Sequence, residues 1–288
     1  MSSLPLAQPK PSSGLLDRVL TPGPLPLIMG VVNATSDSFY AASRARTERA
    51  VLDRALQLAE QGADIIDIGG QSTRPGSDPV SESEELDRTV AAIEAFVRNS
   101  KIPVSIDTDK AAVARACRKA GARMLNDVSA LRNDPLMLKE AVEFEAVVLM
   151  HLGGGSPKTM QKKPVYADVV KEVKNFLSER IETFVKAGGD RSRALVDPGI
   201  GFGKDLDHNL SLLKHLSEFS KLAPVVLGAS RKSFLGRVTP DAGPDERLAG
   251  SLASALWGAE HGARIVRVHD VGDTQRALQA LAAIRSAK

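Results

Sequence analysis

Short apolar runs alternate along the chain with longer segments in which apolar residues recur at helical spacing. Eight such runs, rich in Val and Ile, follow residue 24; they are 26–33, 64–70, 103–108, 123–128, 146–151, 194–199, 224–230 and 264–270. A strand that is buried on both faces has an almost continuous apolar sequence of this kind. Each run therefore predicts one strand of a parallel sheet.

The segments between the runs predict amphipathic helices. In residues 47–62 the apolar side chains repeat at the spacing of one helix face; they are Val51, Leu52, Ala55, Leu56 and Ala59. Thr47 is a candidate cap at the start of this helix and Gly62 at its end. The same spacing recurs in 81–99, 109–121, 134–144, 167–188, 207–220, 245–262 and 272–287.

Strand–helix units fill residues 25–288 without an obvious linker, which predicts a single-domain α/β fold, a closed (β/α)8 TIM barrel. A doubly wound open sheet is the alternative. The chain has no glycine fingerprint for dinucleotides after a strand, and this favours the barrel. Residues 1–24, which are rich in Pro, Ser and Gly, predict a flexible N-terminal arm.

Composition narrows the class of protein. Of the 288 residues 43% are hydrophobic and 25% charged, which excludes a mainly disordered chain, and no apolar stretch has the length of a membrane span. The net charge of +3 is poor evidence for nucleic-acid binding, and an aromatic content of 4% is too low for a base-stacking surface. We therefore expect small-molecule partners, no nucleic acid and no membrane. The single cysteine, Cys117, excludes an internal disulfide, and the lack of a secretory pattern at the N-terminus predicts a cytoplasmic protein.

Every predicted strand ends in polar or ionisable residues. These ends are Asn33, Gln71–Arg74, Asp107, Asn126–Asp127, His151, Asp197, Ser230–Lys232 and Arg267–Asp270. Any single one can be a helix cap or a solvent contact. Because the active site of such a barrel lies at the carboxyl ends of its strands, the convergence of all of them predicts a ligand site.

The polar strand ends divide into two halves. Hydrogen-bond acceptors and one cation that suit the edge of a planar heterocycle come from Asp107, Asn126, Asp197 and Lys232. Groups that can share an anion such as phosphate come from Asn33, Arg74, Arg267 and His269, on strands that adjoin in a closed barrel. For Arg267 an outward salt bridge is the alternative.

Motifs along the chain resemble those of the dihydropteroate synthases, folate-pathway enzymes that sulfonamides target. They are MGVVNATSDSF (29–39), DIIDIGGQSTRPGSDPVSESEEL (64–86), SIDT (105–108), LNDV (125–128), LMH (149–151) with PKTMQ (157–161), VDPGIGFGK (196–204), SRKSFLG (230–236) and RVHDV (267–271). The resemblance implies a TIM barrel, usually a homodimer, that condenses 6-hydroxymethyl-7,8-dihydropterin diphosphate with 4-aminobenzoate. The products would be 7,8-dihydropteroate and pyrophosphate, with Mg²⁺ assisting.

The same resemblance implies roles for individual residues. The pterin pocket would comprise Asp107, Asn126, Met150, Asp197, Phe202, Gly228 and Lys232. The diphosphate would be held by Asn33, Arg74, Arg267 and His269, with Asn33 also near Mg²⁺. The 4-aminobenzoate would be bordered by Phe39, Thr73, Pro75 and Ser233. Core packing is the alternative role for Met150 and Phe202.

The catalytic residues would be Asp107, Asp197, Lys232 and Arg267. Departure of the diphosphate leaves cationic character on the pterin methylene, which carboxylates stabilise, while Mg²⁺, Arg267 and His269 stabilise the departing anion. The arylamine then attacks. This chemistry needs no covalent enzyme intermediate, which agrees with a sequence that offers no evident Ser-His-Asp or Cys-His set.

The first loop departs from the family pattern. Ser36 stands where the family has proline, and Ala41-Ala42-Ser43 stands where it has aspartate and two glycines. Because alanine lacks the conformational freedom of glycine, this loop is expected to close differently, which leaves sulfonamide insensitivity open.

Two other functions remain as alternatives. One is a methyltransferase domain on the same barrel, which would have no need for both SRKS and RVHDV; the other is a non-catalytic pterin-binding homologue. For the homodimer the candidate apolar stripe is Leu248, Leu252, Leu256 and Trp257, and a helix face buried within one subunit is the alternative. The sequence predicts structural or surface positions for Cys117, His151, His208, His215 and His261.

Overall fold

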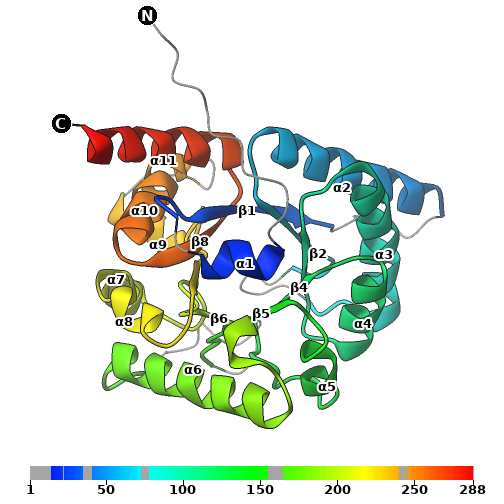
Figure 1. The fold of residues 1–288 in the computed structure, drawn as a ribbon, viewed down its shortest axis with the longest axis horizontal. Coiled ribbons are helices and arrows are strands. Elements are labelled where there is room, and N and C mark those ends of the chain that lie inside the picture. The colour runs from blue at the N-terminus through cyan, green and yellow to red at the C-terminus, as the bar shows by residue number, and fades with distance from the viewer. Residues whose placement is uncertain are drawn as a thin grey trace, which may run out of the picture.

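The computed structural model describes residues 14–21, 23–34, 41–72, 78–154, 165–239, 243 and 246–287, and for Leu16 and residues 41–47 it describes the backbone alone. Parallel strands in sequence order form a closed barrel, in which the last strand pairs with the first (Figure 1). They are β1 (Leu27–Asn33), β2 (Ile65–Gly69), β3 (Val104–Asp107), β4 (Met124–Asp127), β5 (Ala146–Met150), β6 (Ala194–Asp197), β7 (Val225–Leu227) and β8 (Ala263–Val268). The predicted TIM barrel is confirmed and the open sheet is excluded.

Helices ring the barrel on its outside (Figure 1). They are α2 (Ala41–Glu60), α3 (Glu82–Asn99), α4 (Ala111–Lys119), α5 (Met137–Ala141), α6 (Val169–Lys186), α7 (Leu206–Lys214), α8 (Ser217–Ser220), α9 (Ser233–Val238), α10 (Leu248–Glu260) and α11 (Val271–Ser286). The prediction for 47–62 is wrong at its start, since α2 begins at Ala41 and Thr47 lies inside it. The predicted helix 207–220 divides into α7 and α8, and α9 was not predicted.

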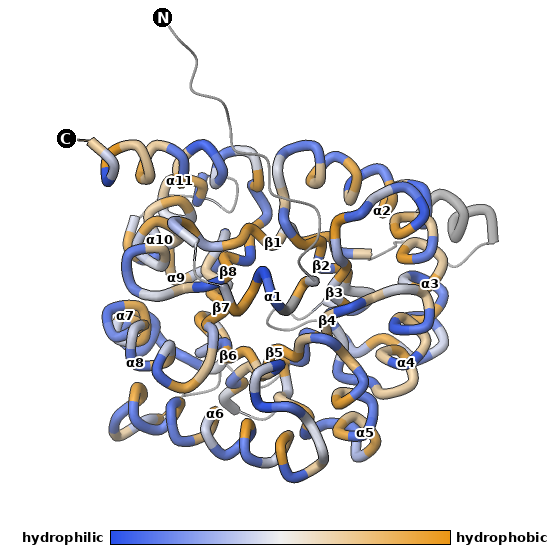
Figure 2. Tube along the Cα trace, in the orientation of Figure 1, coloured by the Kyte–Doolittle hydropathy of each residue, from blue (hydrophilic) through white to orange (hydrophobic). Residues whose placement is uncertain are grey.

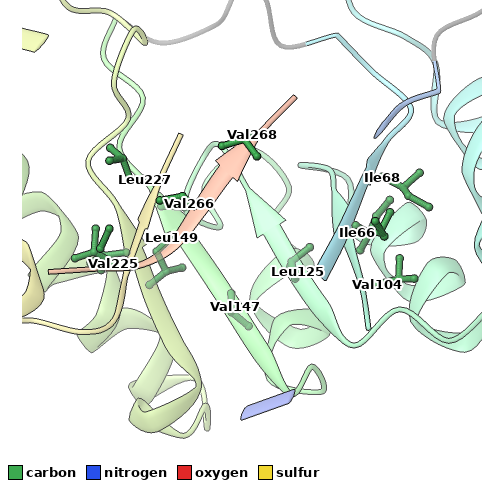
Figure 3. Packing of buried hydrophobic residues seen from close by; sticks show 14 of the residues in the cluster. Ile66, Ile68, Val104, Leu125, Val147, Leu149, Val225, Leu227, Val266 and Val268 are labelled. Carbon is green, nitrogen blue, oxygen red and sulfur yellow. The ribbon is translucent and has the colours of Figure 1, made fainter. Parts of the chain in front are cut away.

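The strands are mainly apolar because both faces of the sheet are buried. Residues that point outward, such as Ile66, Val147 and Val225, pack in the layer between strands and helices (Figure 3). Residues that point inward, such as Met29 and Ile265, form a second apolar cluster inside the barrel. Figure 2 shows the resulting pattern, with apolar strands at the centre and polar positions on the outer helices.

A short helix, α1 (Leu15–Leu20), lies across one opening of the barrel (Figure 1). Leu15 and Val19 are each 1% exposed and belong to the inner apolar cluster, and Arg264 Nε donates to the Val19 carbonyl over 2.6 Å. The prediction of a flexible arm is therefore wrong for Leu15–Leu20, because two apolar side chains close the amino-terminal end of the barrel. Any ligand must enter at the opposite end, where the strands finish.

The chain reverses tightly between helix and strand. Gly62 after α2 and Gly262 after α10 have φ angles of +99° and +92°, which residues with a β-carbon rarely adopt. The predicted helix-ending role of Gly62 is confirmed, and Gly262 has the same role after α10. None of the helices in the described part of the chain combines the length and the apolarity that a membrane span requires.

Candidate functional site

Three polar side chains from separate strands face the interior at the carboxyl end of the barrel. Asp107 on β3, Asn126 on β4 and Asp197 on β6 are 7%, 6% and 4% exposed. Asp107 and Asn126 lie side by side in the β3–β4 register, and the Asp197 carboxylate accepts the Gly199 N–H over 2.7 Å. Residues that the sequence analysis grouped as polar strand ends of matching chemistry thus lie in one buried layer.

Arg267 on β8 directs its guanidinium group into this layer. Its Nε donates to Asp67 Oδ2 over 2.7 Å, and its Nη2 donates to Asp107 Oδ2 over 2.8 Å. The alternative of an outward salt bridge is wrong, because both partners lie inside the barrel. The pair of contacts spans the distance from β8 to β2 and β3.

Asp67 was not found by the sequence analysis. It is fully buried on β2, and its Oδ2 accepts a further hydrogen bond from Asn126 Nδ2 over 3.2 Å. The signal that marks it is an acidic residue in the middle of an apolar strand, where an unpaired charge is costly. Its position completes a network in which one arginine and one asparagine are held by two carboxylates.

Lys232 reaches the layer from the loop after β7. Its ammonium group donates to the Ile200 carbonyl and lies 4.3 Å from the centre of the Phe202 ring. A β-carbon on Gly228 would lie 3.6 Å from Asp197 Oδ2 and 3.8 Å from Lys232 Nζ. Glycine at this position therefore keeps the space between the two charged groups open.

Met150 and Phe202 are not part of the main core. They belong to a small apolar cluster with Val128 and Leu152 at the carboxyl end of the barrel. Met150 is 3% exposed and lies beside Asp197 in the β5–β6 register. The site therefore has an apolar part that adjoins two of its ionisable residues, Asp197 and Lys232.

Burial favours the neutral forms of Asp107, Asp197 and Lys232, while their oppositely charged neighbours favour the ionised forms. It raises the pKa of Asp107 to about 8, although Arg267 lowers it, and it also raises the pKa of Asp197, which Lys232 opposes. Burial lowers the pKa of Lys232 to about 8, with Asp197 acting in the other direction. For Arg267 burial disfavours the charge, but Asp67 and Asp107 together raise its pKa above the ordinary value, so it remains a cation.

Polar contacts connect the segments that follow β7 and β8. His269 meets the Ser230 hydroxyl through its backbone N–H and its Nδ1, over 3.2 Å and 3.1 Å. Arg231, with a φ of +57°, forms a two-pronged ion pair with Asp270 over 2.9 Å and 2.6 Å. This pair joins the loops that follow β7 and β8, and it was not predicted.

The remaining predicted residues lie at the rim of the barrel or outside the residues that the structure describes. Asn33 is exposed at the end of β1, and Ser233 is exposed as the first residue of α9. The described structure does not include Ser36, Phe39, Thr73, Arg74 and Pro75. The Ala41-Ala42-Ser43 segment, which stands where the family has aspartate and two glycines, is the first part of α2, and this suits the high helix propensity of alanine.

A buried lysine supports the loop between β6 and α7. Lys204, 3% exposed, contacts His151 Nδ1 and the Phe202 carbonyl, each over 2.9 Å. Burial lowers the pKa of Lys204 to about 7 and that of His151 to about 2, so this imidazole is neutral. The contact fixes the segment that carries Phe202.

Asp127, which adjoins Asn126, serves the backbone instead of the site. Its two carboxylate oxygens accept the N–H groups of Ser129 and Leu131 over 2.7 Å and 2.9 Å. Within the described residues no three side chains of His, Cys, Asp or Glu are gathered so that they could hold a metal ion.

Comparison with known proteins places this geometry in a family. The sequence profile described as "Pterin binding enzyme" matches residues 29–269. The chain is 44% identical to a dihydropteroate synthase of Escherichia coli over 91% of this chain and 93% of that one, and 41% identical to one of Synechocystis over 85% of each. Its structure resembles Xanthomonas albilineans dihydropteroate synthase with 4-aminobenzoic acid, at a TM-score of 0.84, 44% identity and coverage of 92% and 94% of the two chains. It also resembles the Yersinia pestis enzyme with a sulfonamide drug complex, at a TM-score of 0.85, 42% identity and coverage of 91% and 95%.

Proposed function

Because the chain belongs to the dihydropteroate synthase family of pterin-binding enzymes, we propose that the buried polar layer and its rim hold the two substrates of that reaction. The protein is a transferase that condenses 6-hydroxymethyl-7,8-dihydropterin diphosphate with 4-aminobenzoate to give 7,8-dihydropteroate and pyrophosphate. The observation that carries the assignment of roles is the layer of Asp107, Asn126 and Asp197, with Lys232 and Arg267 directed into it.

The pterin ring is assigned to the layer itself. Ring N–H groups would donate to Asp107 and Asp197, while Asn126 can both donate and accept. Met150 and Phe202 would cover the apolar face of the ring, and Gly228 leaves room for it beside Lys232. Lys232 would donate to a ring nitrogen or carbonyl.

The diphosphate is assigned to the β8 side of the site. Arg267 supplies a planar guanidinium group, which suits phosphate oxygens, and His269 and Asn33 lie nearer the rim. Arg74 stays a prediction for the same anion. Charge that develops on the leaving diphosphate would thus be met by a fixed cation, while the carboxylates of Asp107 and Asp197 stabilise the positive charge on the pterin.

The residues present fit a magnesium ion carried by the substrate. Mg²⁺ is usually held by one or two protein oxygens together with substrate phosphates. Asn33, exposed at the end of β1, offers one such oxygen beside the proposed diphosphate site. When bound, Mg²⁺ would neutralise charge on the diphosphate as it departs.

The 4-aminobenzoate is assigned to the rim. Ser233 is exposed there, directly after Lys232, and Phe39, Thr73 and Pro75 stay predictions for the same subsite. The amine would approach the pterin methylene from this side.

We also propose that the protein is cytoplasmic and that it forms a homodimer. The large apolar side chain of Trp257, which is 44% exposed on α10, supports the dimer.

Turnover by the purified chain tests the proposal. With Mg²⁺, pterin diphosphate and 4-aminobenzoate, equal amounts of dihydropteroate and pyrophosphate should form. Pterin binding without product would indicate the non-catalytic homologue. Methyl transfer from methyltetrahydrofolate to a corrinoid would indicate the methyltransferase, and an Asp197→Asn protein serves as the matched low-affinity control.

A further inference from the structure

Asp67 is a buried carboxylate at the centre of the site network. It is 0% exposed in the interior of β2, and its register partner on β3 is Ser105. Through Oδ2 it contacts Arg267 from β8 and Asn126 from β4. One side chain therefore ties together residues from both halves of the site.

Packing alone does not explain an acid in this place. Among the described residues its Oδ1 has no hydrogen-bond partner, and the buried hydroxyl of neighbouring Ser105 has none either. A buried charge of this kind is expensive, and well-packed apolar residues often replace buried ion pairs at little cost in stability. The carboxylate is therefore best explained by what it does for Arg267.

The two carboxylates that hold Arg267 contact different parts of its guanidinium group. Asp67 accepts from Nε, the nitrogen next to the aliphatic chain, and Asp107 accepts from Nη2 at the tip. The Nε contact fixes the direction of the whole plane. The Nη2 contact is at the end that phosphate oxygens approach.

We infer that Asp67 is a positioning residue that remains the counter-ion of Arg267 while Asp107 exchanges its contact with Arg267 for the pterin ring. This inference rests on the proposed function. Because Asp67 lies deeper in the barrel than the layer of substrate contacts, it keeps Arg267 oriented when the tip of the guanidinium group turns to the diphosphate. Without it, this exchange would leave Arg267 without the carboxylate that fixes the direction of its guanidinium plane.

Charge on Asp67 also affects Asp107 directly. The groups that face Asp107 are Arg267 from β8, Asp67 from β2, Glu85 from α3, Asp109 from the following loop and Lys232 from the β7 loop. Asp67 raises the pKa of Asp107, and it also raises that of Arg267. Removal of this one charge should therefore lower the pKa of Asp107 while the shape of the site is kept.

The test is Asp67→Asn. The matched control is Ser105→Ala, an uncharged change at the register partner of Asp67 on β3. Calorimetric titration with pterin diphosphate and with the pterin alcohol that lacks phosphate should show at least a tenfold loss for the diphosphate and a much smaller loss for the alcohol. Binding of the alcohol should increase with pH as Asp107 ionises, and its midpoint should move to lower pH in Asp67→Asn alone. An unchanged midpoint, or an equal loss for both ligands, would overturn the inference.

Both readouts are separate from turnover. If the wild-type chain makes no dihydropteroate, the proposed reaction fails while the binding comparison still decides the role of Asp67. If Asp67→Asn does not fold, the wild-type protein decides it through nitrogen NMR of arginine side chains, with Arg267 assigned by Arg267→Lys. The Nε–H of Arg267 should exchange slowly with and without pterin diphosphate, and loss of that protection on binding would overturn the inference.

Discussion

At the scale of single residues, the site depends on charges that are buried but not fully neutralised. Asp107 and Lys232 both have pKa values near 8, each moved there mainly by burial. Such groups respond strongly to one change of charge or of hydrogen-bonding capacity. Substitutions that keep the shape of a side chain are therefore the most informative.

Asp197→Asn should weaken pterin binding by at least tenfold and leave the fold intact. An amide would present a donor where the carboxylate offers a second acceptor, and an unpaired polar contact in a buried pocket costs about 1–3 kcal/mol. Calorimetric titration with a pterin analogue measures the effect, and an unchanged melting temperature is the control. Equal affinity of the two proteins would remove Asp197 from the pterin pocket.

Arg267→Ala should reduce affinity for pterin diphosphate far more than affinity for the pterin alcohol. The reason is that the guanidinium group supplies the charge for the anion, whereas the ring contacts come from other strands. Parallel titrations with the two ligands give the ratio of losses. A ratio near one would mean that Arg267 serves only the internal network.

At the scale of elements, loops at the mouth are fixed by contacts to their neighbours. Lys204 holds the β6–α7 loop, and the Arg231–Asp270 pair joins the loops after β7 and β8. Helix α1 closes the barrel at the opposite end. Substitutions that affect stability and substitutions that affect ligand binding should therefore fall in different elements.

Lys204→Met should change how stability depends on pH. Because the folded pKa of Lys204 is about 7 and that of a free lysine 10.5, the folded state holds fewer protons between these values than the unfolded state. Unfolding free energy of the wild type should therefore increase with pH across this window relative to the variant. Denaturant unfolding of both proteins at about pH 6 and about pH 9 measures the difference, and parallel behaviour of the two would refute the shifted pKa.

Leu15→Ala should destabilise the protein by about 2–5 kcal/mol, because it leaves a cavity between α1 and the inner cluster. Pterin affinity should not change, since α1 lies at the end opposite the site. Urea unfolding measures the first effect and calorimetry the second. A loss of affinity would show that the two ends of the barrel are coupled.

At the scale of the whole molecule, closure of the barrel decides which residues meet. The proposed homodimer belongs to this scale as well. Trp257 on α10 is 44% exposed and stacks against His261 at 3.8 Å between ring centres. A large aromatic surface of this kind is typical of interfaces.

Trp257→Glu should convert the proposed dimer to a monomer, because a charge would be buried in an apolar contact. Light scattering after size-exclusion chromatography measures the mass. The exposed Ile284 on α11 provides the control, and Ile284→Glu should leave the mass unchanged. A monomeric wild type would refute the dimer itself.

The sequence alone was sufficient for the barrel and for most of its strand and helix positions, because apolar periodicity and helix-ending glycines such as Gly62 are local signals. It also grouped Asp107, Asn126 and Asp197, since strand ends must meet in a closed barrel. Only the tertiary structure decided the partners of Arg267, because Asp67 lies 200 positions away along the chain. Likewise, no local pattern shows that Leu15 and Val19 fill the barrel end, since that burial exists only once all the strands have closed around them.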